Sequence, residues 1–321
     1  MEAAGFNFRQ DRLSWTEGEH EYAFFLDEDG SHAAFLEQAP PSIRAALVSA
    51  RGRRNVTERR FRAAVGIYAL ITTLPLLLLL AFVLNVGILA EWLADRIPVE
   101  QEARIGQMVL AQTRARTRLI ERGPALDAVK LIGERLTAGS RYRYQWFVAQ
   151  DSEVNAFAAP GGVVVVNAGL IAKAARPEEL AGVLAHEVSH VERRHSMQGL
   201  VKKAGLSLLL SLALGDFGGS SIAGLASTLT ELKFSRDAEA EADSEGVKRL
   251  ASAGIDPKGM SDFFAKLAKD ENGKGPALLA THPAPAERMA RIQRQITTLP
   301  ATTPAPLPLD WRGVQASLES R

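Results

Sequence analysis

The chain has 321 residues, enough for two domains or for one domain with appendages. Its net charge is only +1 and it has no basic stripe interleaved with aromatics, so nothing indicates nucleic-acid binding. The absence of cysteine excludes disulfides and cysteine-ligated zinc, which leaves histidine and carboxylate side chains as the strong protein ligands for a metal.

Residues 1–62 are predicted to form a small β-rich module followed by a basic juxtamembrane segment. Short aromatic-rich alternations, Phe6 to Phe8 and Tyr22 to Phe25, precede a turn signal at Asp29-Gly30. The arginines at the end of the segment are expected to set membrane topology and to contact anionic lipid. No residue in this part of the sequence indicates catalysis.

Residues 63–90 are predicted to form one transmembrane helix. The stretch contains no charged side chain and includes five consecutive leucines at positions 76–80. It exceeds the roughly 20 residues that cross a bilayer core of about 30 Å, and membrane helices tolerate a proline such as Pro75. A cleaved signal peptide fits poorly, because 62 residues precede the stretch and its apolar run is too long.

Arginine is distributed unevenly around this span. The following twenty residues contain only Arg96 and Arg104, whereas the upstream flank contains Arg44, Arg51, Arg53, Arg54, Arg59, Arg60 and Arg62. The positive-inside rule therefore predicts a single-pass protein of the inner (cytoplasmic) membrane with a cytoplasmic N-terminus. The residues after about 91 are expected on the periplasmic, or extracytoplasmic, side, and the lipid bilayer is an expected partner.

Residues 91–299 are predicted to form a mostly helical domain with one small sheet, an α+β arrangement. The expected strands are 142–148, 153–158 and 163–167. The last two of these strands are joined by Ala159-Pro160-Gly161-Gly162, a composition typical of a tight turn. The expected helices are 99–121, 124–136, 177–200, 229–253, 257–270 and 283–296.

Two further segments are defined by composition. The apolar stretch 204–230 is too short for two crossings, which need about 40 residues. It is expected to be a helical hairpin broken near 215–219, either buried in the domain or lying on the membrane surface. Residues 300–321 begin with a proline-rich run at 300–308 and are expected to be a flexible tail.

The helix expected at 177–200 carries the motif His186-Glu187-Val188-Ser189-His190. Pro177 followed by two glutamates suits a first helical turn. On a helix, two histidines four residues apart project from one face, so both can bind one zinc ion. Glu187 then reaches a zinc-bound water, which is the H-E-x-x-H arrangement of zinc metallopeptidases. The alternative is a pair of histidines that only pack or cap, beside a surface glutamate.

A catalytic zinc takes three protein ligands and keeps one position for water. Downstream of the histidines, residues 235–243 read S-R-D-A-E-A-E-A-D, and several carboxylates compete for the third place. Glu239 and Asp243 share a helix face, whereas Glu241 points about 200° away from Glu239. If Glu239 binds zinc, Asp243 can accept the free N–H of a ligand histidine. An ordinary solvated acidic helix is the alternative.

Together, H-E-V-S-H and S-R-D-A-E-A-E-A-D resemble the HtpX-like and BepA-like family of membrane-associated zinc metallopeptidases, which are gluzincins related to the CAAX prenyl proteases. The segment 155–162 resembles the family's strand before the zinc helix, and Thr281-His282-Pro283 with Arg288 resembles its C-terminal element. The similarity covers about residues 98–296. The chain departs from HtpX in having one span before the catalytic domain and none paired after the zinc motif, and residues 297–321 contain no BepA-type helical repeats.

The resemblance implies a zincin-type metalloprotease domain with one Zn²⁺ per chain, held by His186, His190 and Glu239. Glu187 is then the expected general base, and Asp243 corresponds to the family's aspartate four residues after the ligand. His282 is expected either to donate to the oxyanion or to plug the site as a fourth ligand, with a helix-capping histidine as the alternative.

Arg288 is expected to hold Glu239 or Asp243 by a bidentate contact, with a surface arginine as the alternative. His195, near the end of the zinc helix, is interpreted as structural.

The expected function is a zinc metalloendopeptidase that cleaves extended or misfolded polypeptides in quality control of membrane or envelope proteins. The substrate is expected to add a strand beside Asn155, Ala156 and Phe157 through backbone hydrogen bonds. One alternative is a latent protease that works as a chaperone or assembly factor. Another is a narrow-specificity processing protease, such as a CAAX protease, although that activity needs a chamber built from several spans. The oligomeric state stays open.

Overall fold

The computed structural model describes residues 10–27, 31–203, 233–269, 278, 280, 282, 286–300 and 304–319. The chain divides into two compact units, Met1–Val83 and Leu84–Arg321. The expected hairpin at 204–230 and the turn at Asp29-Gly30 lie outside the described residues.

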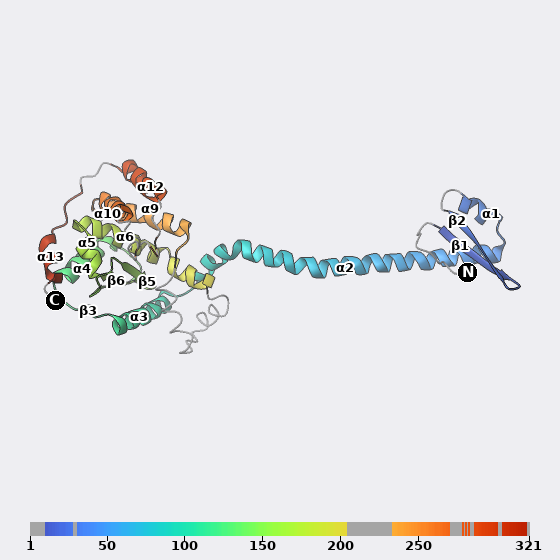
Figure 1. The fold of residues 1–321 in the computed structure, drawn as a ribbon, viewed down its shortest axis with the longest axis horizontal. Helices are drawn as coiled ribbons and strands as arrows, with labels where there is room; N and C mark the ends of the chain where they lie inside the picture. Colours follow the sequence, from blue (N-terminus) through green and yellow to red (C-terminus); the bar gives the residue numbers. More distant parts are fainter. Residues whose placement is uncertain are drawn as a thin grey trace. The chain divides into compact units, whose positions relative to one another are not determined.

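In the first unit, β1 (Gln10–Glu17) and β2 (His20–Asp27) form an antiparallel hairpin (Figure 1). Its two-residue turn contains Gly18, whose φ of 63° suits a residue without Cβ. Helix α1 (Ser31–Gln38) follows, and its Phe35 ring lies 6.2 Å from that of Phe24. From residue 41 onward the chain is helical, so the basic segment is not a separate element.

Helix α2 (Pro41–Ala94) includes both the basic segment and the apolar stretch in one continuous helix. Within the described residues, its segment Arg59–Phe82 is the one long and apolar enough to cross a membrane, with a mean hydropathy of 2.3 and no buried residues in its apolar window. The expected span at 63–90 overlaps this segment but extends further. Its last residues belong to the second unit, where Ala90 and Ala94 are buried against Met197 and Leu200.

The second unit contains a four-stranded sheet of order β3-β4-β6-β5. Strands β4 and β6 are parallel and the other neighbours are antiparallel. Strand β6 is valine-rich and fully buried, as expected for a central strand covered on both faces. The strands are β3 (Leu119–Ile120), β4 (Gln145–Ala149), β5 (Ala156–Ala159) and β6 (Val163–Asn167).

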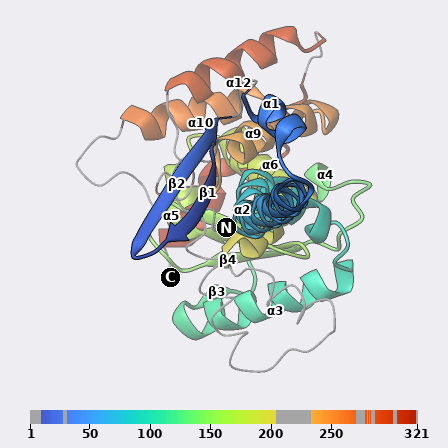
Figure 2. The ribbon, with the colours of Figure 1, turned by 90° about the vertical axis from the view of Figure 1, so that its right-hand side faces the viewer.

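Helices cover both faces of this sheet. Helix α3 (Val99–Arg116) packs Val109 and Leu110 on one face, whereas α4 (Pro124–Leu136) and α6 (Pro177–Glu192) lie on the other (Figure 2). Strand β5 is left as an edge strand between α3 and α6. The β5–β6 turn places Gly161 and Gly162 at φ values of 76° and 93°, as the expected tight turn requires.

Further helices of this unit are α5 (Ala168–Lys173), α9 (Arg236–Ser252), α10 (Lys258–Lys269) and α12 (Ala286–Thr298). Helix α6 is buried along most of its length because α4, α9 and α10 all pack against it. Two glycines permit this close approach. A Cβ on Gly182 would lie 2.5 Å from the Met260 Cα, and one on Gly246 would touch the Ala185 backbone at 3.4 Å.

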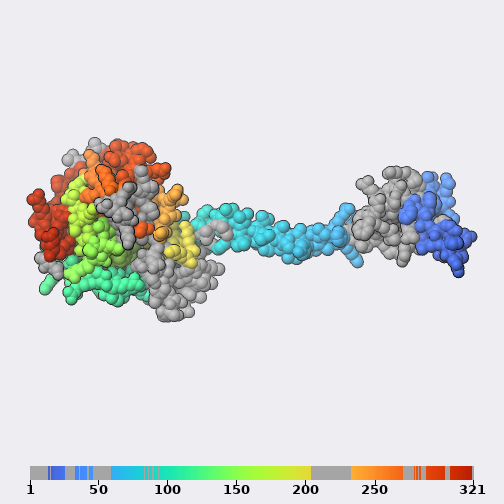
Figure 3. Space-filling model, in the orientation of Figure 1, coloured from blue at the N-terminus to red at the C-terminus, as the bar shows by residue number. Residues whose placement is uncertain are grey.

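The expectation of a flexible tail at 300–321 is wrong for residues 304–319. Helix α13 (Trp311–Glu319) packs against α4 and α5, and Figure 3 shows it in dark red beside them. Trp311 and Val314 are buried, and the Trp311 indole N–H donates to the Ala174 carbonyl at 2.9 Å. The proline-rich composition concealed an amphipathic helix in which Trp311, Val314 and Leu318 share one face.

The helix expected at 177–200 is interrupted. Helix α6 ends at Glu192, and a second helical segment at 195–203 follows a turn at Arg193-Arg194. Arg194 has a φ of 57°, an unusual conformation for a residue other than glycine.

The Arg194 side chain fixes this turn. Its guanidinium donates to the carbonyls of Ala94 at 2.6 Å and Ile97 at 3.1 Å, and to the Tyr142 hydroxyl at 3.1 Å. It also forms an ion pair with the buried Glu102 at 2.8 Å. These contacts join the end of α2 to the residues that follow α6.

Candidate metal centre

The two histidines of the motif are presented by α6. Pro177 occupies the first turn, where its missing N–H costs nothing, and Glu178 and Glu179 lie at the positive end of the helix dipole. His186, Glu187 and His190 are each buried to within 2% of full burial, so their polar atoms face protein groups rather than bulk water.

The neighbouring helix α9 brings two carboxylates to the same point. It begins at Ser235, whose side chain accepts a hydrogen bond from the Ala238 N–H at 3.2 Å as an N-cap. Glu239 and Asp243, one helical turn apart, are both buried against α6. Glu241, the competing carboxylate, faces elsewhere and is 45% exposed.

Four donor atoms from His186, His190, Glu239 and His282 all lie within 4.8 Å of one another and are buried. The Nε2 atoms of His186 and His190 are 3.0 Å apart. The His282 Nδ1 lies 3.2 Å from the His186 Nε2 and 2.7 Å from the Glu239 Oε1. Three imidazoles and one carboxylate that converge in this way form a donor set suited to a divalent transition metal. The residues therefore fit a metal ion.

Asp243 and Arg288 support this group from behind. The Asp243 Oδ1 lies 3.0 Å from the His186 Nδ1, which places a proton on that nitrogen and leaves the Nε2 lone pair directed into the cluster. The Arg288 guanidinium contacts Asp243 at 2.5 and 2.8 Å and Glu239 at 2.7 Å. The sequence predicted that Arg288 holds either Glu239 or Asp243, and in the structure Arg288 contacts both carboxylates.

The electrostatics of the cluster favour a positive charge. Burial lowers the pKa of His186, but the adjacent Glu239 and Asp243 carboxylates together outweigh burial and raise that pKa to about 9. The pKa of Glu239 is lowered far below its usual range, because the charge of His186 and hydrogen bonds from the histidines outweigh burial. Burial keeps the pKa of His190 well below its usual value. Such a site attracts a cation.

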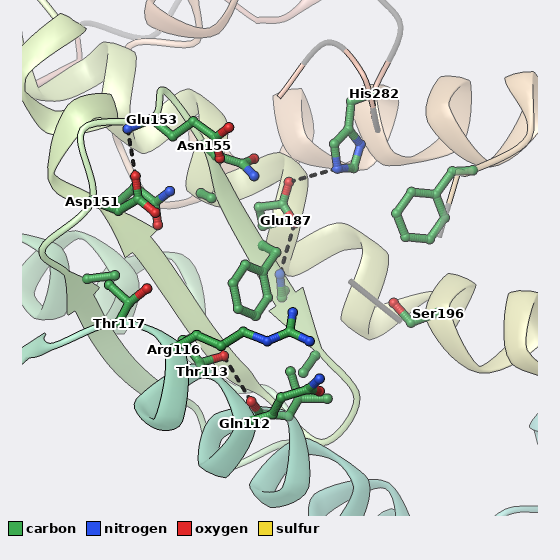
Figure 4. A pocket seen from close by; sticks show the side chains of 18 residues that line it. Gln112, Thr113, Arg116, Thr117, Asp151, Glu153, Asn155, Glu187, Ser196 and His282 are labelled. Atoms are coloured by element: carbon green, nitrogen blue, oxygen red, sulfur yellow. Dashed lines mark hydrogen bonds and ion pairs between the residues drawn. The ribbon is translucent and has the colours of Figure 1, made fainter. Parts of the chain in front are cut away.

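Glu187 lies beside the four donors but contacts the sheet. Its Oε2 accepts a hydrogen bond from the Ala158 N–H at 3.1 Å, and its Oε1 lies 3.4 Å from the His282 Nε2 (Figure 4). Burial raises its pKa, against the opposing effects of His282 and His186. Because the Ala158 N–H is directed to Glu187 and not to β6, the carboxylate lies at the outer edge of β5.

A cleft runs along this edge, as Figure 4 shows. One wall contains β5 and its approach, including the predicted strand residues Asn155, Ala156 and Phe157, and Glu187 and His282 lie at its inner end. The other wall is the face of α3 that carries Val109, Gln112, Thr113 and Arg116. Sequence reasoning missed this wall, although the i, i+3, i+4, i+7 spacing was available as a signal.

Sequence reasoning missed Phe234, and it treated His195 as structural and Glu241 as facing elsewhere, without predicting that either lies near His190. The Phe234 ring stacks on His190 with centroids 4.0 Å apart, and His195 and Glu241 form a chain of contacts behind His190. Nothing in the spacing of His195 indicates this contact, because it depends on the turn at Arg194.

A buried H-E-x-x-H helix with a carboxylate from a second helix defines the metal centre of a metallopeptidase. The family model for peptidase family M48 matches residues 126–296, more than half of the chain. The chain therefore belongs to peptidase family M48, which confirms the resemblance drawn from the motifs.

The curated relatives carry related names. The chain is 30% identical to a putative beta-barrel assembly-enhancing protease of Vibrio cholerae over 242 residues, which are 70% of this chain and 50% of that protein. It is 31% identical to the beta-barrel assembly-enhancing protease of Escherichia coli (60% and 43% covered) and 32% identical to the metalloprotease LoiP of the same species (50% and 64% covered). The chain spans about half the length of the first two relatives.

Proposed function

We propose that this protein is a zinc-dependent metalloendopeptidase that cleaves extended or misfolded polypeptides in membrane or envelope protein quality control. The observation that carries the proposal is the position of Glu187, which is buried between the four converging donors and the outer edge of β5. Membership of family M48 and relatives named as proteases support it.

In this mechanism His186, His190 and Glu239 would hold the zinc ion. When bound, zinc supplies a Lewis acid that lowers the pKa of water towards 7 and stabilises a developing oxyanion. Glu187 accepts the proton as water attacks the scissile carbonyl and then delivers it to the leaving amine. Arg288 and Asp243 hold Glu239 and His186 in orientation while the proton moves.

The substrate binds as an extended strand along β5, beside Asn155, Ala156 and Phe157. An edge strand offers free backbone groups, and added strands are recognised mainly through main-chain hydrogen bonds. Three of the four residues of β5 are alanine, so the strand has little side chain with which to read sequence. This supports broad selectivity for unfolded segments.

Bound zinc is the direct test of the ligand set. The wild-type protein is expected to contain about one zinc per chain by elemental analysis, whereas His186→Ala and Glu239→Ala lose it because each removes one of three ligands. A chelator is expected to abolish peptidase activity, and added zinc to restore it. Full zinc retention in Glu239→Ala would assign the third ligand to Glu241 or to another side chain.

A latent form is the second candidate, and the position of His282 favours it. Its Nδ1 lies among the three expected ligands, so the imidazole can fill the fourth position that a reacting water needs. His282→Ala is expected to raise peptidase activity towards an unfolded substrate, measured against the wild type at equal zinc content. Absence of any proteolysis in both proteins would favour a chaperone or assembly factor.

The proposal includes membrane anchoring by α2, in the inner membrane, with the N-terminus in the cytoplasm and Leu84–Arg321 outside it. The arginines upstream of the apolar segment support this orientation. Because the chain lacks cysteine, single cysteines can report it. In intact spheroplasts, Lys130→Cys is expected to react with an impermeant maleimide and Glu17→Cys to be protected. The reverse pattern would overturn the orientation.

A further inference from the structure

His195 is buried behind the group formed by His186, His190, Glu239 and His282, and it contacts His190 through one ring nitrogen. Its Nδ1 lies 2.9 Å from the His190 Nδ1, and its Nε2 lies 3.2 Å from the Glu241 Oε2. In a continuous helix, a residue five positions after His190 would point about 140° away from it. The turn at Arg193-Arg194, with the left-handed backbone of Arg194, brings His195 back to His190.

The distances require one arrangement of protons when a metal binds His190. The His190 Nε2 faces His186 and Glu239, so its lone pair is the one available to the metal. A neutral His190 then carries its proton on Nδ1, and two ring nitrogens 2.9 Å apart share one proton. His195 must therefore accept through Nδ1 and donate through its Nε2–H to Glu241.

The series of contacts from His190 through His195 to Glu241 is held in place at both ends. Glu241 also accepts from the Arg193 side chain, with 3.2 Å between the Arg193 Nε and the Glu241 Oε1. His195 itself is outside the group of four converging donors, and both of its ring nitrogens already have partners. Its contacts are therefore those of a residue that acts through His190, not those of a metal ligand.

We infer that His195, backed by Glu241, is a positioning residue that fixes the tautomer and ring orientation of His190 for metal binding. The inference rests on the proposed metal site. The two histidines of the motif are supported differently. His186 donates to Asp243, a buried carboxylate paired with Arg288, whereas His190 donates to a neutral imidazole whose carboxylate partner is 45% exposed. The effect of removing His195 should therefore exceed that of removing the Glu241 charge.

The test measures the zinc dissociation constant of the full-length protein by competition with a chromogenic chelator. His195→Leu keeps the bulk but removes the acceptor, so zinc binding is expected to weaken by about 10- to 100-fold, the usual effect of losing such a partner. His195→Asn is expected to bind zinc nearly as well as the wild type, because its Oδ1 can accept from the His190 Nδ1–H. Rescue by asparagine separates hydrogen bonding from packing.

Two glutamates on α9, Glu241 and Glu245, provide a matched pair that tests the contact between His195 and Glu241. Glu241→Gln is expected to weaken zinc binding less than His195→Leu does. Glu245→Gln should leave it unchanged, because Glu245 also pairs with Arg193 but lies outside the His195 contacts. The visible spectrum of the cobalt-substituted protein should change in His195→Leu and not in Glu245→Gln, since it reports the ligand geometry directly.

The outcomes separate this inference from the proposed function. A wild-type protein that binds no zinc would overturn both. Wild-type zinc binding with an unchanged dissociation constant and cobalt spectrum in a folded His195→Leu protein would overturn only the role of His195. If His195→Leu does not fold, the other variants decide. The role of His195 would be overturned if Glu241→Gln and Glu245→Gln bind zinc equally well and His195→Asn binds zinc more weakly than the wild type.

Discussion

Replacing Glu187 by glutamine is expected to lower the turnover number for casein by about 10²- to 10⁴-fold, the usual contribution of a general acid–base residue. Glutamine has nearly the same shape, and its amide oxygen can still accept the Ala158 N–H that Glu187 accepts now. It cannot take a proton from water. The loss should therefore appear in turnover, with zinc content and fold unchanged.

A second glutamate on the same helix serves as the control. Glu192 lies at the end of α6 and bonds the hydroxyls of Ser140 and Tyr144, away from the cluster. Glu192→Gln is expected to cleave casein within about twofold of the wild type, since Glu192 is not among the four converging donors and its hydroxyl partners lie away from them. A Glu187→Gln protein that degrades casein as fast as the wild type would contradict the mechanism.

Replacing Arg194 by methionine is expected to destabilise the second unit by about 3–5 kcal/mol, because it leaves the buried Glu102 without its charged partner. It also removes donors from the Ala94 and Ile97 carbonyls. Methionine replaces the aliphatic part of the side chain and keeps most of the backbone preference, so the loss reports the guanidinium. Urea unfolding of the full-length protein followed by pulse proteolysis measures it.

The neighbouring arginine is the matched control. Arg193 is 46% exposed and pairs with surface carboxylates, so Arg193→Met is expected to cost no more than about 1 kcal/mol. The double variant Arg194→Met with Glu102→Leu should recover part of the stability, since no buried charge then remains. Equal losses in the two single arginine variants would show that the buried ion pair does not stabilise the turn.

Local signals predicted much of this structure from the sequence. Helix 124–136 was predicted with its observed bounds, and the turn predicted at 159–162 lies within one residue of the observed turn after Ala159, because a proline start and two glycines act over a few residues. The motif histidines were recognised for the same reason: helical spacing alone places them on one face. The choice among Glu239, Glu241 and Asp243 needed the family resemblance, since spacing left alternatives open.

The features that sequence reasoning missed depend on contacts between distant residues. The break after Glu192 follows from the bonds of Arg194 to carbonyls about a hundred positions earlier, which no local pattern encodes. The contact of His195 with His190 is a consequence of that break. The helix at 311–319 forms because Trp311 fills a site beside Ala174, whereas composition emphasised the prolines before it.

The alanine-rich edge strand β5 has a kinetic consequence for the proteins that this enzyme would cleave. In the proposed binding mode, a segment lies along β5 only after it has left its own fold, so the cleavage rate should follow the fraction of each substrate protein that is unfolded. A substrate protein stable by about 5.5 kcal/mol exposes its core in roughly one molecule in ten thousand. Each 1.4 kcal/mol of damage would speed its removal about tenfold. The half-life of a substrate protein would thus report its folding free energy more than its sequence.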